Sequence, residues 1–421
     1  IMITAGIQLS AAVSYSVSGK VVDAKSGEAL VGAVVSLENL WAISDENGEF
    51  EFDKVQSGKY GMKVDLLGYA AYNEEVMVSG NLSGLEIRLS VSSLALEEVV
   101  VTASRQKDGA GTTYNIGRDA LNHIQLSNMA DMSSLMPGGK TVNPDLTASK
   151  PFSLRSGNST AGNAAFSTAV EVDGVRVGGN AGFGTMSGAD TRSISVDNVD
   201  YVEVVTGVPS AEYGDLGNGM VKIHTKRGKT PLAINMSVNP RTYQGSVSKG
   251  ININEKGAVL NLNAEWARAV KDLVSPYESY TRRTIGAVYS NTFNKTVRFE
   301  AGVTGNIGGM NSEDDPDAFS GAYTKSNDNS VRANASVTWL LNRSWITNLK
   351  FEPYFDYEDN KSHEHIYNSA ASMLPAIHAE VEGYSFADLL PQGEYFSDKI
   401  VDSKEINAGA SLKYTWDKRW G

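Results

Sequence analysis

Two clusters of side chains in the C-terminal half of the chain have the chemistry of metal ligands. His363 and His365 stand on either side of Glu364, and alternate histidines on an extended segment can share one metal ion. The acidic stretch Glu313–Asp317 offers carboxylate oxygens of the kind that Ca²⁺ prefers. The histidine pair has no identifiable third ligand, and the acidic spacing differs from that of known calcium loops. We therefore predict two polar loops, no metal site and no bound cofactor; Ca²⁺ at Glu313–Asp317 stays the alternative.

The rest of the sequence shows no set of catalytic residues. We recognise no serine–histidine–acid set and no phosphate-cradling loop, and Gly174 lies in a turn rather than ahead of a helix. The absence of cysteine excludes disulfides and thiolate metal sites. A net charge of −12 argues against nucleic acid, whose binding proteins carry basic patches. We expect a protein that is not an enzyme and does not bind nucleic acid.

The elements that position the two clusters are predicted to be strands, because the sequence has a two-residue hydrophobic period from residue 232 onward. One set of apolar side chains alternates with polar ones, as in Val331, Ala333, Ala335 and Val337 against Arg332, Asn334 and Ser336. Eight strands are expected, near 232–239, 243–253, 258–268, 281–293, 296–307, 329–341, 344–357 and 404–416. Strands with one apolar and one polar face match a transmembrane β-barrel with lipid outside and a wet lumen inside.

The predicted connections alternate in length. Tight turns follow the second, fourth and sixth strands, whereas long polar loops follow the third, fifth and seventh. The first connection, at 240–242, is short and is the exception. Short turns on one side and long loops on the other are typical of an outer-membrane barrel, and the two metal-like clusters lie in the long loops.

Three blocks of the region 114–228 stand ahead of these strands. They read Leu154-Arg155-Ser156-Gly157, Val172-Asp173-Gly174-Val175 and Val202–Gly214, the last followed by the strand-like Met220–Thr225. In this order they resemble the plug domain of TonB-dependent outer-membrane transporters. The resemblance implies an α+β plug whose motif and barrel contacts involve Arg155, Gly157, Asp173, Gly174, Glu203, Gly207, Tyr213 and Gly214. Because buried charges must be paired, salt bridges of Arg155, Glu171, Asp173, Arg176 and Glu203 are expected to hold the plug against the barrel. The alternative is that these charges are solvated and face water in the lumen.

A glycine-rich loop at 177–190 interrupts the plug region. It would present Asn180, Phe183 and Met186 to a ligand at the top of the plug. The alternative is that this loop is only a flexible connection. Earlier in the plug, Met129, Met132 and Leu135 recur at helical spacing and predict a helix over 127–135 whose methionines belong to the core.

Residues 17–91 have short strand-like runs separated by turns at the spacing of a β-sandwich. They resemble the carboxypeptidase-regulatory-like domain that precedes the plug in transporters of the Bacteroidetes type, the SusC/RagA-like superfamily. Residues 1–16 resemble the remnant of a signal peptide.

The segment 96–103 resembles a Ton box, the segment that TonB grasps by strand addition. Its β-branched run, flanked by polar chain, suits that mode of binding, and the TonB-binding residues would be Glu97, Glu98, Val99, Val100, Val101 and Thr102. A last strand of the preceding sandwich is the alternative interpretation. The position of the run just ahead of the plug favours the Ton box.

Together these resemblances imply an all-β dominated protein with an N-terminal β-sandwich, an α+β plug and, over 232–421, an antiparallel transmembrane β-barrel. Plugged barrels have about 22 strands, so the eight strands here are expected to belong to a truncated barrel. The implied function is TonB-dependent import of a glycan, peptide or chelate across the bacterial outer membrane. The implied partners are TonB, outer-membrane lipid and a SusD-like lipoprotein lid. A non-transporting signalling receptor or surface ligand-binding protein is the alternative.

Overall fold

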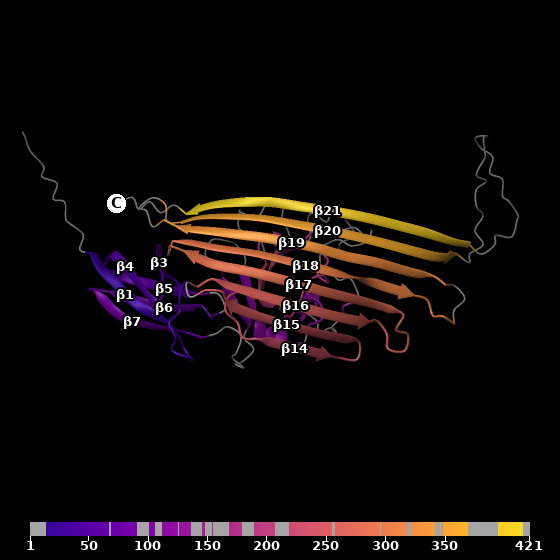
Figure 1. The fold of residues 1–421 in the computed structure, drawn as a ribbon, viewed down its shortest axis with the longest axis horizontal. Helices are drawn as coiled ribbons and strands as arrows, with labels where there is room; N and C mark the ends of the chain where they lie inside the picture. Colours follow the sequence, from indigo (N-terminus) through magenta and orange to yellow (C-terminus); the bar gives the residue numbers. More distant parts are fainter. Residues whose placement is uncertain are drawn as a thin grey trace, which may run out of the picture.

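The computed structural model describes residues 14–66, 69–90, 101–105, 112–124, 126–135, 145–147, 154, 168–178, 189–206, 219–254, 257–294, 296–317, 321–341, 346, 348–368 and 395–415. These residues form a small N-terminal domain, a central unit and a long antiparallel sheet (Figure 1). Among the described residues, no helix is both long and apolar enough to cross a membrane.

The N-terminal domain is a sandwich of two sheets. Its strands are β1 (Ser14–Asp23), β2 (Val34–Leu37), β3 (Leu40–Ile43), β4 (Glu49–Gln56), β5 (Gly58–Asp65), β6 (Tyr72–Val78) and β7 (Leu82–Leu89). One sheet has the order β4-β1-β7 and the other the order β3-β2-β5-β6. Alternate side chains of β5, such as Met62 and Val64, are buried in the core between the sheets. The expected β-sandwich is confirmed.

The central unit, called the plug below, is one mixed sheet with short helices against it. It contains β8 (Val101–Arg105), β9 (Thr112–Gly117), α1 (Arg118–His123), the 3₁₀ helix η1 (Met129–Leu135), β10 (Ala169–Val172), β11 (Val175–Arg176), β12 (Val199–Thr206) and β13 (Met220–Thr225). The strand order is β11-β10-β13-β12-β9-β8, with β10 parallel to β13. Met129, Met132 and Leu121 from the helices pack on Val202 and Ile223 of the sheet.

The third unit, called the barrel sheet below, runs in consecutive antiparallel order. Its strands are β14 (Ala233–Val238), β15 (Thr242–Asn252), β16 (Val259–Val270), β17 (Glu278–Phe293), β18 (Val297–Glu313), β19 (Tyr323–Leu340), β20 (Asn348–Asn368) and β21 (Tyr395–Thr415). All eight predicted strands are present, in the predicted order. The expected fold class, an all-β protein with a sandwich, a plug and a sheet that resembles part of a barrel, is therefore confirmed.

The outer ends of the barrel sheet differ from the prediction. His363, Glu364 and His365 lie inside β20 and not in a loop, and Glu313 is the last residue of β18. The backbone ladder continues here, because Tyr323 pairs with His365 and His365 pairs with Asp398. Backbone hydrogen bonds need no apolar alternation, so these strands extend past the point where the hydrophobic period ends. The prediction of a loop was wrong for His363, Glu364, His365 and Glu313, whereas residues 314–317 do lie between β18 and β19, outside the strands.

The two ends of the barrel sheet are unlike, as expected. At one end, three residues separate β17 from β18 and six separate β15 from β16, whereas at the other end 26 residues separate β20 from β21. The N-terminal domain lies at the end with the tight turns (Figure 1).

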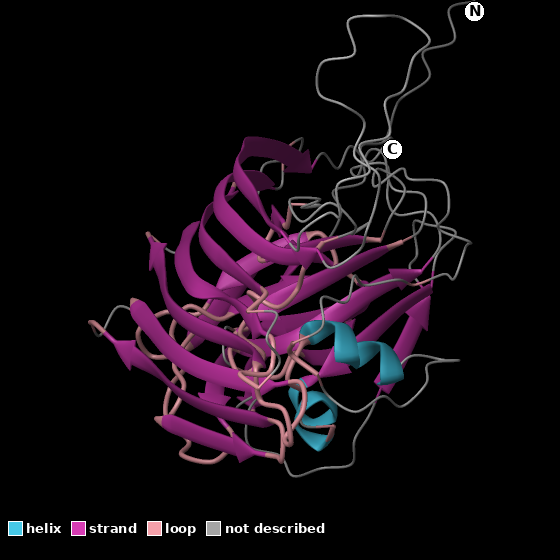
Figure 2. Cartoon of the chain, turned by 90° about the vertical axis from the view of Figure 1, so that its right-hand side faces the viewer, coloured by secondary structure: helices cyan, strands magenta, loops and turns pink. Residues whose placement is uncertain are grey.

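The two faces of the barrel sheet are also unlike. The sheet is curved (Figure 2), and plug residues contact its polar face. Val331 is 43% exposed while its neighbour Arg332 is 7% exposed and contacts the plug, so the predicted facing of these two residues is confirmed. The opposite face exposes large apolar side chains, among them Met236, Ile285 and Ile406. A broad exposed apolar face is what a lipid-facing barrel wall presents.

Candidate functional site

The hairpin of β10 and β11 carries the Asp-Gly turn that the sequence singled out. Asp173 and Gly174 both have positive φ, 51° and 84°, and Val172 pairs with Val175 across the turn. A two-residue hairpin with positive φ at both positions favours Asp-Gly, because glycine meets no Cβ clash and aspartate tolerates the left-handed region. The turn places the Asp173 carboxylate beside Thr225 of β13 and the Asp173 carbonyl beside β19 of the barrel sheet.

Asp173 is bound on several sides. Its carboxylate accepts hydrogen bonds from Thr225 N at 3.0 Å and Thr225 Oγ1 at 2.5 Å, and it pairs with Arg227 Nη2 at 2.5 Å. Its backbone carbonyl accepts a hydrogen bond from Asn334 Nδ2 of β19 at 2.9 Å. Burial acts to raise the pKa of Asp173, but Arg227 and the Thr225 hydrogen bonds outweigh burial and hold that pKa below its usual value. Asp173 is therefore ionised at neutral pH.

Arg227 joins the plug to the barrel sheet. Its second amino group pairs with Glu300 Oε2 of β18 at 2.6 Å, and Glu300 also accepts from Arg298 Nε at 2.8 Å. The Arg227 side chain is 20% exposed, between carboxylates that are 10% and 13% exposed. Removing one partner from a pair this buried costs about 3–5 kcal/mol, because the other charge stays buried. We call the set Asp173, Arg227 and Glu300 the latch.

A second contact lies deeper between the plug and the sheet. The side chains of Arg282 (β17) and Glu265 (β16) are 0% and 1% exposed and pair through Arg282 Nε at 2.8 Å. Arg282 also donates to the backbone oxygens of Arg192 at 2.9 Å and Ser127 at 3.3 Å, and Ser195 donates to Glu265. Both members of this barrel-sheet pair therefore form hydrogen bonds with the plug.

Two further polar contacts join the plug to the barrel sheet. Arg332 Nη2 donates to Ser193 Oγ at 3.0 Å, while Arg332 Nε lies 3.2 Å from Asp356. Elsewhere, Gln244 Nε2 of β15 donates to Asp197 at 3.1 Å, and Asp197 pairs with Arg118 of α1 at 3.1 Å. Polar contacts therefore hold the plug to β15, β16, β17 and β19.

Sequence reasoning did not single out Arg227, Glu300, Glu265 and Arg282. For Glu300, Glu265 and Arg282, the available signal was their place in the polar set of alternating strands, because a charged residue there faces the side on which the plug lies. Arg227 lies between β13 and β14, outside these strands, and the alternation gave no signal for it. Charges on the same face of neighbouring strands, such as Glu265 and Arg282, then become candidates for a pair.

Glu203 lies on the face of the plug sheet opposite Thr225. Its nearest cation is Lys222 at 3.8 Å, and His224 lies 4.0 Å away. His224 stacks on Tyr201 with ring centres 4.3 Å apart. Burial, more than the nearby Arg227 and Lys222, lowers the pKa of His224 to about 4, so this ring is neutral at pH 7 and Glu203 has no charged histidine partner.

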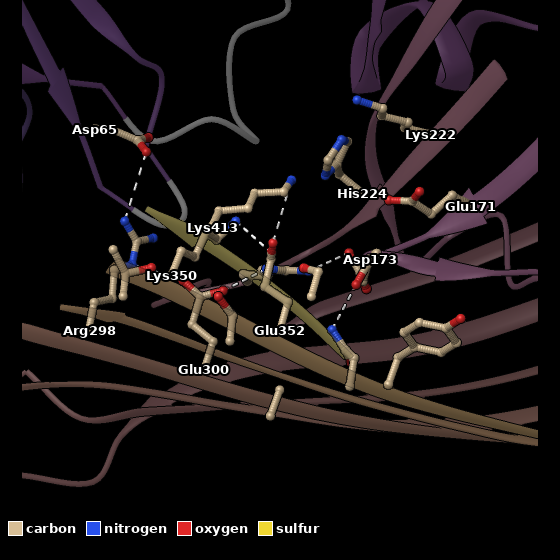
Figure 3. Close-up of a pocket in the computed structure, with 18 of the residues that line it drawn as sticks. Asp65, Glu171, Asp173, Lys222, His224, Arg298, Glu300, Lys350, Glu352 and Lys413 are labelled. Atoms are coloured by element: carbon tan, nitrogen blue, oxygen red, sulfur yellow. Dashed lines mark hydrogen bonds and ion pairs between the residues drawn. The ribbon is translucent and has the colours of Figure 1, made fainter. Parts of the chain in front are cut away.

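A cavity of about 840 Å³ opens beside these residues. Its walls come from the plug (Glu171, Asp173, Lys222, His224), from the barrel sheet (Glu300, Glu352, Lys350, Lys413) and from the N-terminal domain (Trp41, Asp65). Figure 3 shows acidic and basic side chains facing one another across it. Because the lining carries both signs of charge, it does not favour a ligand of one charge.

The predicted TonB-binding segment is described only at its end. Val101 and Thr102 belong to β8, which pairs antiparallel with β9 through Val101↔Ile116 and Thr102↔Asn115. This strand is the edge of the plug sheet and not a strand of the sandwich. Glu97, Glu98, Val99 and Val100 lie outside the described residues, so their role stays a prediction.

Other predicted site residues also lie outside the described residues. They are Arg155, Gly157, Gly207, Tyr213 and Gly214 of the plug motif and the predicted ligand contacts Asn180, Phe183 and Met186. Of the predicted plug contacts, the structure places Asp173 and Gly174 at the barrel sheet, and Glu203 beside the cavity.

The metal-like histidines do lie close together. His363 Nε2 and His365 Nδ1 are each 2.8 Å from Oδ1 of Asp398, and His365 stacks between Tyr323 and Phe396. Across the part of the chain that the structure describes, His, Asp and Glu form no group of three or more that could hold a metal ion. The cluster ties β19, β20 and β21 together at their outer ends.

Two family models match the chain. Residues 17–101 match the CarboxypepD_reg-like domain, and residues 105–221 match the TonB-dependent receptor plug domain. The two domains that the sequence resembled are therefore confirmed, in the expected order. No protein with a curated description matches the sequence.

Solved structures with a similar fold include outer-membrane receptors. The ferric-catecholate import receptor Fiu from E. coli K12, in its open form, has 13% identity and a TM-score of 0.48 over 72% of this chain and 46% of that chain. The alcaligin outer-membrane receptor FauA from Bordetella pertussis has 15% identity and a TM-score of 0.40 over 74% and 49%. The copper transporter OprC has 12% identity and a TM-score of 0.47 over 77% and 45%. The chain spans about half the length of these receptors, and the two matched domains are the more specific finding.

Proposed function

Starting from a chain that carries a CarboxypepD_reg-like domain followed by a TonB-dependent receptor plug domain, we propose that the protein imports a nutrient ligand across the bacterial outer membrane. TonB supplies the coupling to the energised inner membrane, and the plug is remodelled to open a path. In this proposal the protein is of the SusC/RagA-like type, has no catalytic activity and needs no resident cofactor.

The observation that supports the proposal best is how the plug is held. It lies on the polar face of a sheet whose other face is apolar, and its contacts are ion pairs and hydrogen bonds such as Arg227–Glu300 and Arg282–Ser127. Each buried pair costs about 3–5 kcal/mol to break from one side. Several such contacts acting together disfavour spontaneous release of the plug, which supports a role for an external energy source.

The edge strand β8 offers the place where force can enter. Its one ladder partner among the described strands is β9, and an extended segment can add to the other side of such a strand through backbone hydrogen bonds. Force applied at 96–103 would first strip β8 from β9 and then load β12, which pairs with β9. From β12 the load passes to β13 and so to Thr225, the residue that orients Asp173.

A binding measurement with TonB tests this. Val100→Pro removes one N–H donor and fixes φ within the predicted TonB-binding run, so strand addition should fail. We expect the full-length receptor in detergent to bind the periplasmic domain of its own TonB, and Val100→Pro to lose at least about tenfold in affinity.

The matched control is Val91→Pro, which places the same substitution outside the segment 96–103. It should bind TonB as the unaltered receptor does. Equal affinity of all three proteins would place the coupling segment elsewhere and would remove the support for the proposal.

The ligand and the surface partners are further parts of the proposal. The candidate ligand classes are glycans, peptides and chelates, and the lid would be a SusD-like lipoprotein. Mass spectrometry of ligand co-purified with the full-length receptor, together with the proteins that co-purify from outer membranes, tests both. A receptor that binds ligand and TonB without uptake would instead support the signalling alternative.

A further inference from the structure

The N-terminal domain is seated on the rim of the barrel sheet through an apolar contact. Val34 of β2 and Ile43 of β3 pack on Leu340, the last residue of β19, and all three side chains are buried, with Trp41 at the edge. Val34 and Ile43 are directly opposed on neighbouring strands and point away from the sandwich core. An apolar pair on the outer face of a small sandwich needs a cover, and the rim supplies it.

We call the apolar contact of Val34 and Ile43 with Leu340 the seat. Further contacts surround it, and two of them are charged pairs. Asp65 Oδ2 lies 3.9 Å from Arg298 Nη1 of β18, and Glu28 lies 3.7 Å from Lys229. Val31 lies against Gly257, in the turn between β15 and β16, so a Cβ at that glycine would come within 3.3 Å of it. The domain therefore spans the tight-turn ends of β15 to β19 and forms one wall of the cavity.

The seat connects to the latch through alternating charges. Asp65 of the N-terminal domain faces Arg298, Arg298 binds Glu300, Glu300 binds Arg227, and Arg227 binds Asp173 of the plug. Figure 3 shows Asp65, Arg298 and Glu300 following one another along the cavity wall. Asp65 helps fix the Arg298 guanidinium, which shares the Glu300 carboxylate with Arg227. Orienting one donor on a shared carboxylate affects the other.

We propose that the CarboxypepD_reg-like domain docks in cis on the tight-turn rim of the barrel and, through Asp65 and Arg298, reinforces the latch that holds the plug. The docked domain forms one wall of the cavity and keeps the plug in place; its departure weakens the latch. The link to import rests on the proposed function, whereas the docking and its effect on the plug do not. Both measurements below are made without ligand and without TonB, so their failure is separable from a failure of transport.

Cross-linking in outer membranes tests the docking. The native chain has no cysteine, so Val34→Cys with Leu340→Cys gives one defined pair. We expect a short thiol cross-linker to join most of this pair. The control pair, Glu86→Cys with Leu340→Cys, places the first cysteine on β7 of the opposite sheet, where Glu86 is 53% exposed. It should not cross-link, and equal yields from the two pairs would overturn the docking.

Amide hydrogen exchange of the full-length receptor tests the coupling. Asp65→Asn removes one exposed charge contact, so exchange at 220–227 should speed up about two- to fivefold. Val34→Asp undocks the domain and should speed exchange there more than Asp65→Asn does. Lys59→Ala removes the exposed 2.6 Å pair with Glu75 and is the matched control, with no change at 220–227.

A second undocking variant guards against misfolding. Leu340→Ser removes the seat from the rim side, while protection of β1 and β4 reports that the sandwich itself stays folded. In both variants, loss of a cross-link between Glu28→Cys and Lys229→Cys, whose native side chains lie 3.7 Å apart, reports undocking. Unchanged exchange at 220–227 in Val34→Asp and Leu340→Ser, with that cross-link lost, would show that docking does not affect the plug and would overturn the coupling.

Discussion

Arg227→Leu is the substitution that most directly weakens the latch. It removes the cation between Asp173 and Glu300, whose side chains are 10% and 13% exposed, and leaves two buried carboxylates facing each other. Breaking a buried pair from one side costs about 3–5 kcal/mol. In the variant, Glu300 still pairs with Arg298 and Asp173 still accepts hydrogen bonds from Thr225. We therefore expect a cost at the lower end of this range, about 3 kcal/mol, which corresponds to roughly a hundredfold change in the equilibrium for plug release.

Urea-induced release of the plug in detergent measures this. A fluorophore on His123→Cys reports the plug, since His123 is exposed at the end of α1 and no native cysteine competes for the label. The midpoint should fall in Arg227→Leu at unchanged urea dependence. Arg176→Leu is the matched control, because Arg176 is an exposed arginine on the same hairpin as Asp173. Equal midpoints for the two variants would refute the latch.

Two further predictions concern acid and the sheet's faces. The pKa of His224 in the folded protein, about 4, lies below its ordinary 6.5, so the free energy of unfolding falls by about 2–3 kcal/mol as the pH falls from about 6.5 toward 4. His224→Gln should flatten that part of a curve of stability against pH. An unchanged curve would contradict the burial of the neutral ring. Ala335→Arg, on the lipid face, should lower the free energy of unfolding by roughly 2–4 kcal/mol, and Ser336→Arg should lower it much less. Equal losses in a folding titration would contradict the assigned faces.

Local sequence signals predicted the features that depend on neighbouring residues. The Asp173–Gly174 turn follows from two residues that both tolerate positive φ. The alternation around Val331 and Arg332 gave the correct faces, because a strand has a strict two-residue period. The helix predicted over 127–135 is present as the 3₁₀ helix Met129–Leu135, whose methionines are core residues as predicted.

Features set by distant partners could not be predicted in this way. The strand containing His363 and His365 continues because Tyr323 and Asp398 on neighbouring strands extend the ladder, and the hydrophobic period does not record that pairing. The latch joins residues 173, 227 and 300, and the seat joins residues 34 and 340. The two-residue alternation predicted which face of the sheet each residue occupies. It could not predict which of the many lumen-facing charged residues form ion pairs with one another.

The central claim is that force on the segment 96–103 drives import past the plug. The most direct test is the accumulation of the co-purified ligand in the periplasm of intact cells, measured by mass spectrometry. Cells with the unaltered receptor should accumulate it, a protonophore should stop this, and Val100→Pro should abolish it while surface binding persists. Accumulation in Val100→Pro cells equal to that in cells with the unaltered receptor would contradict the account.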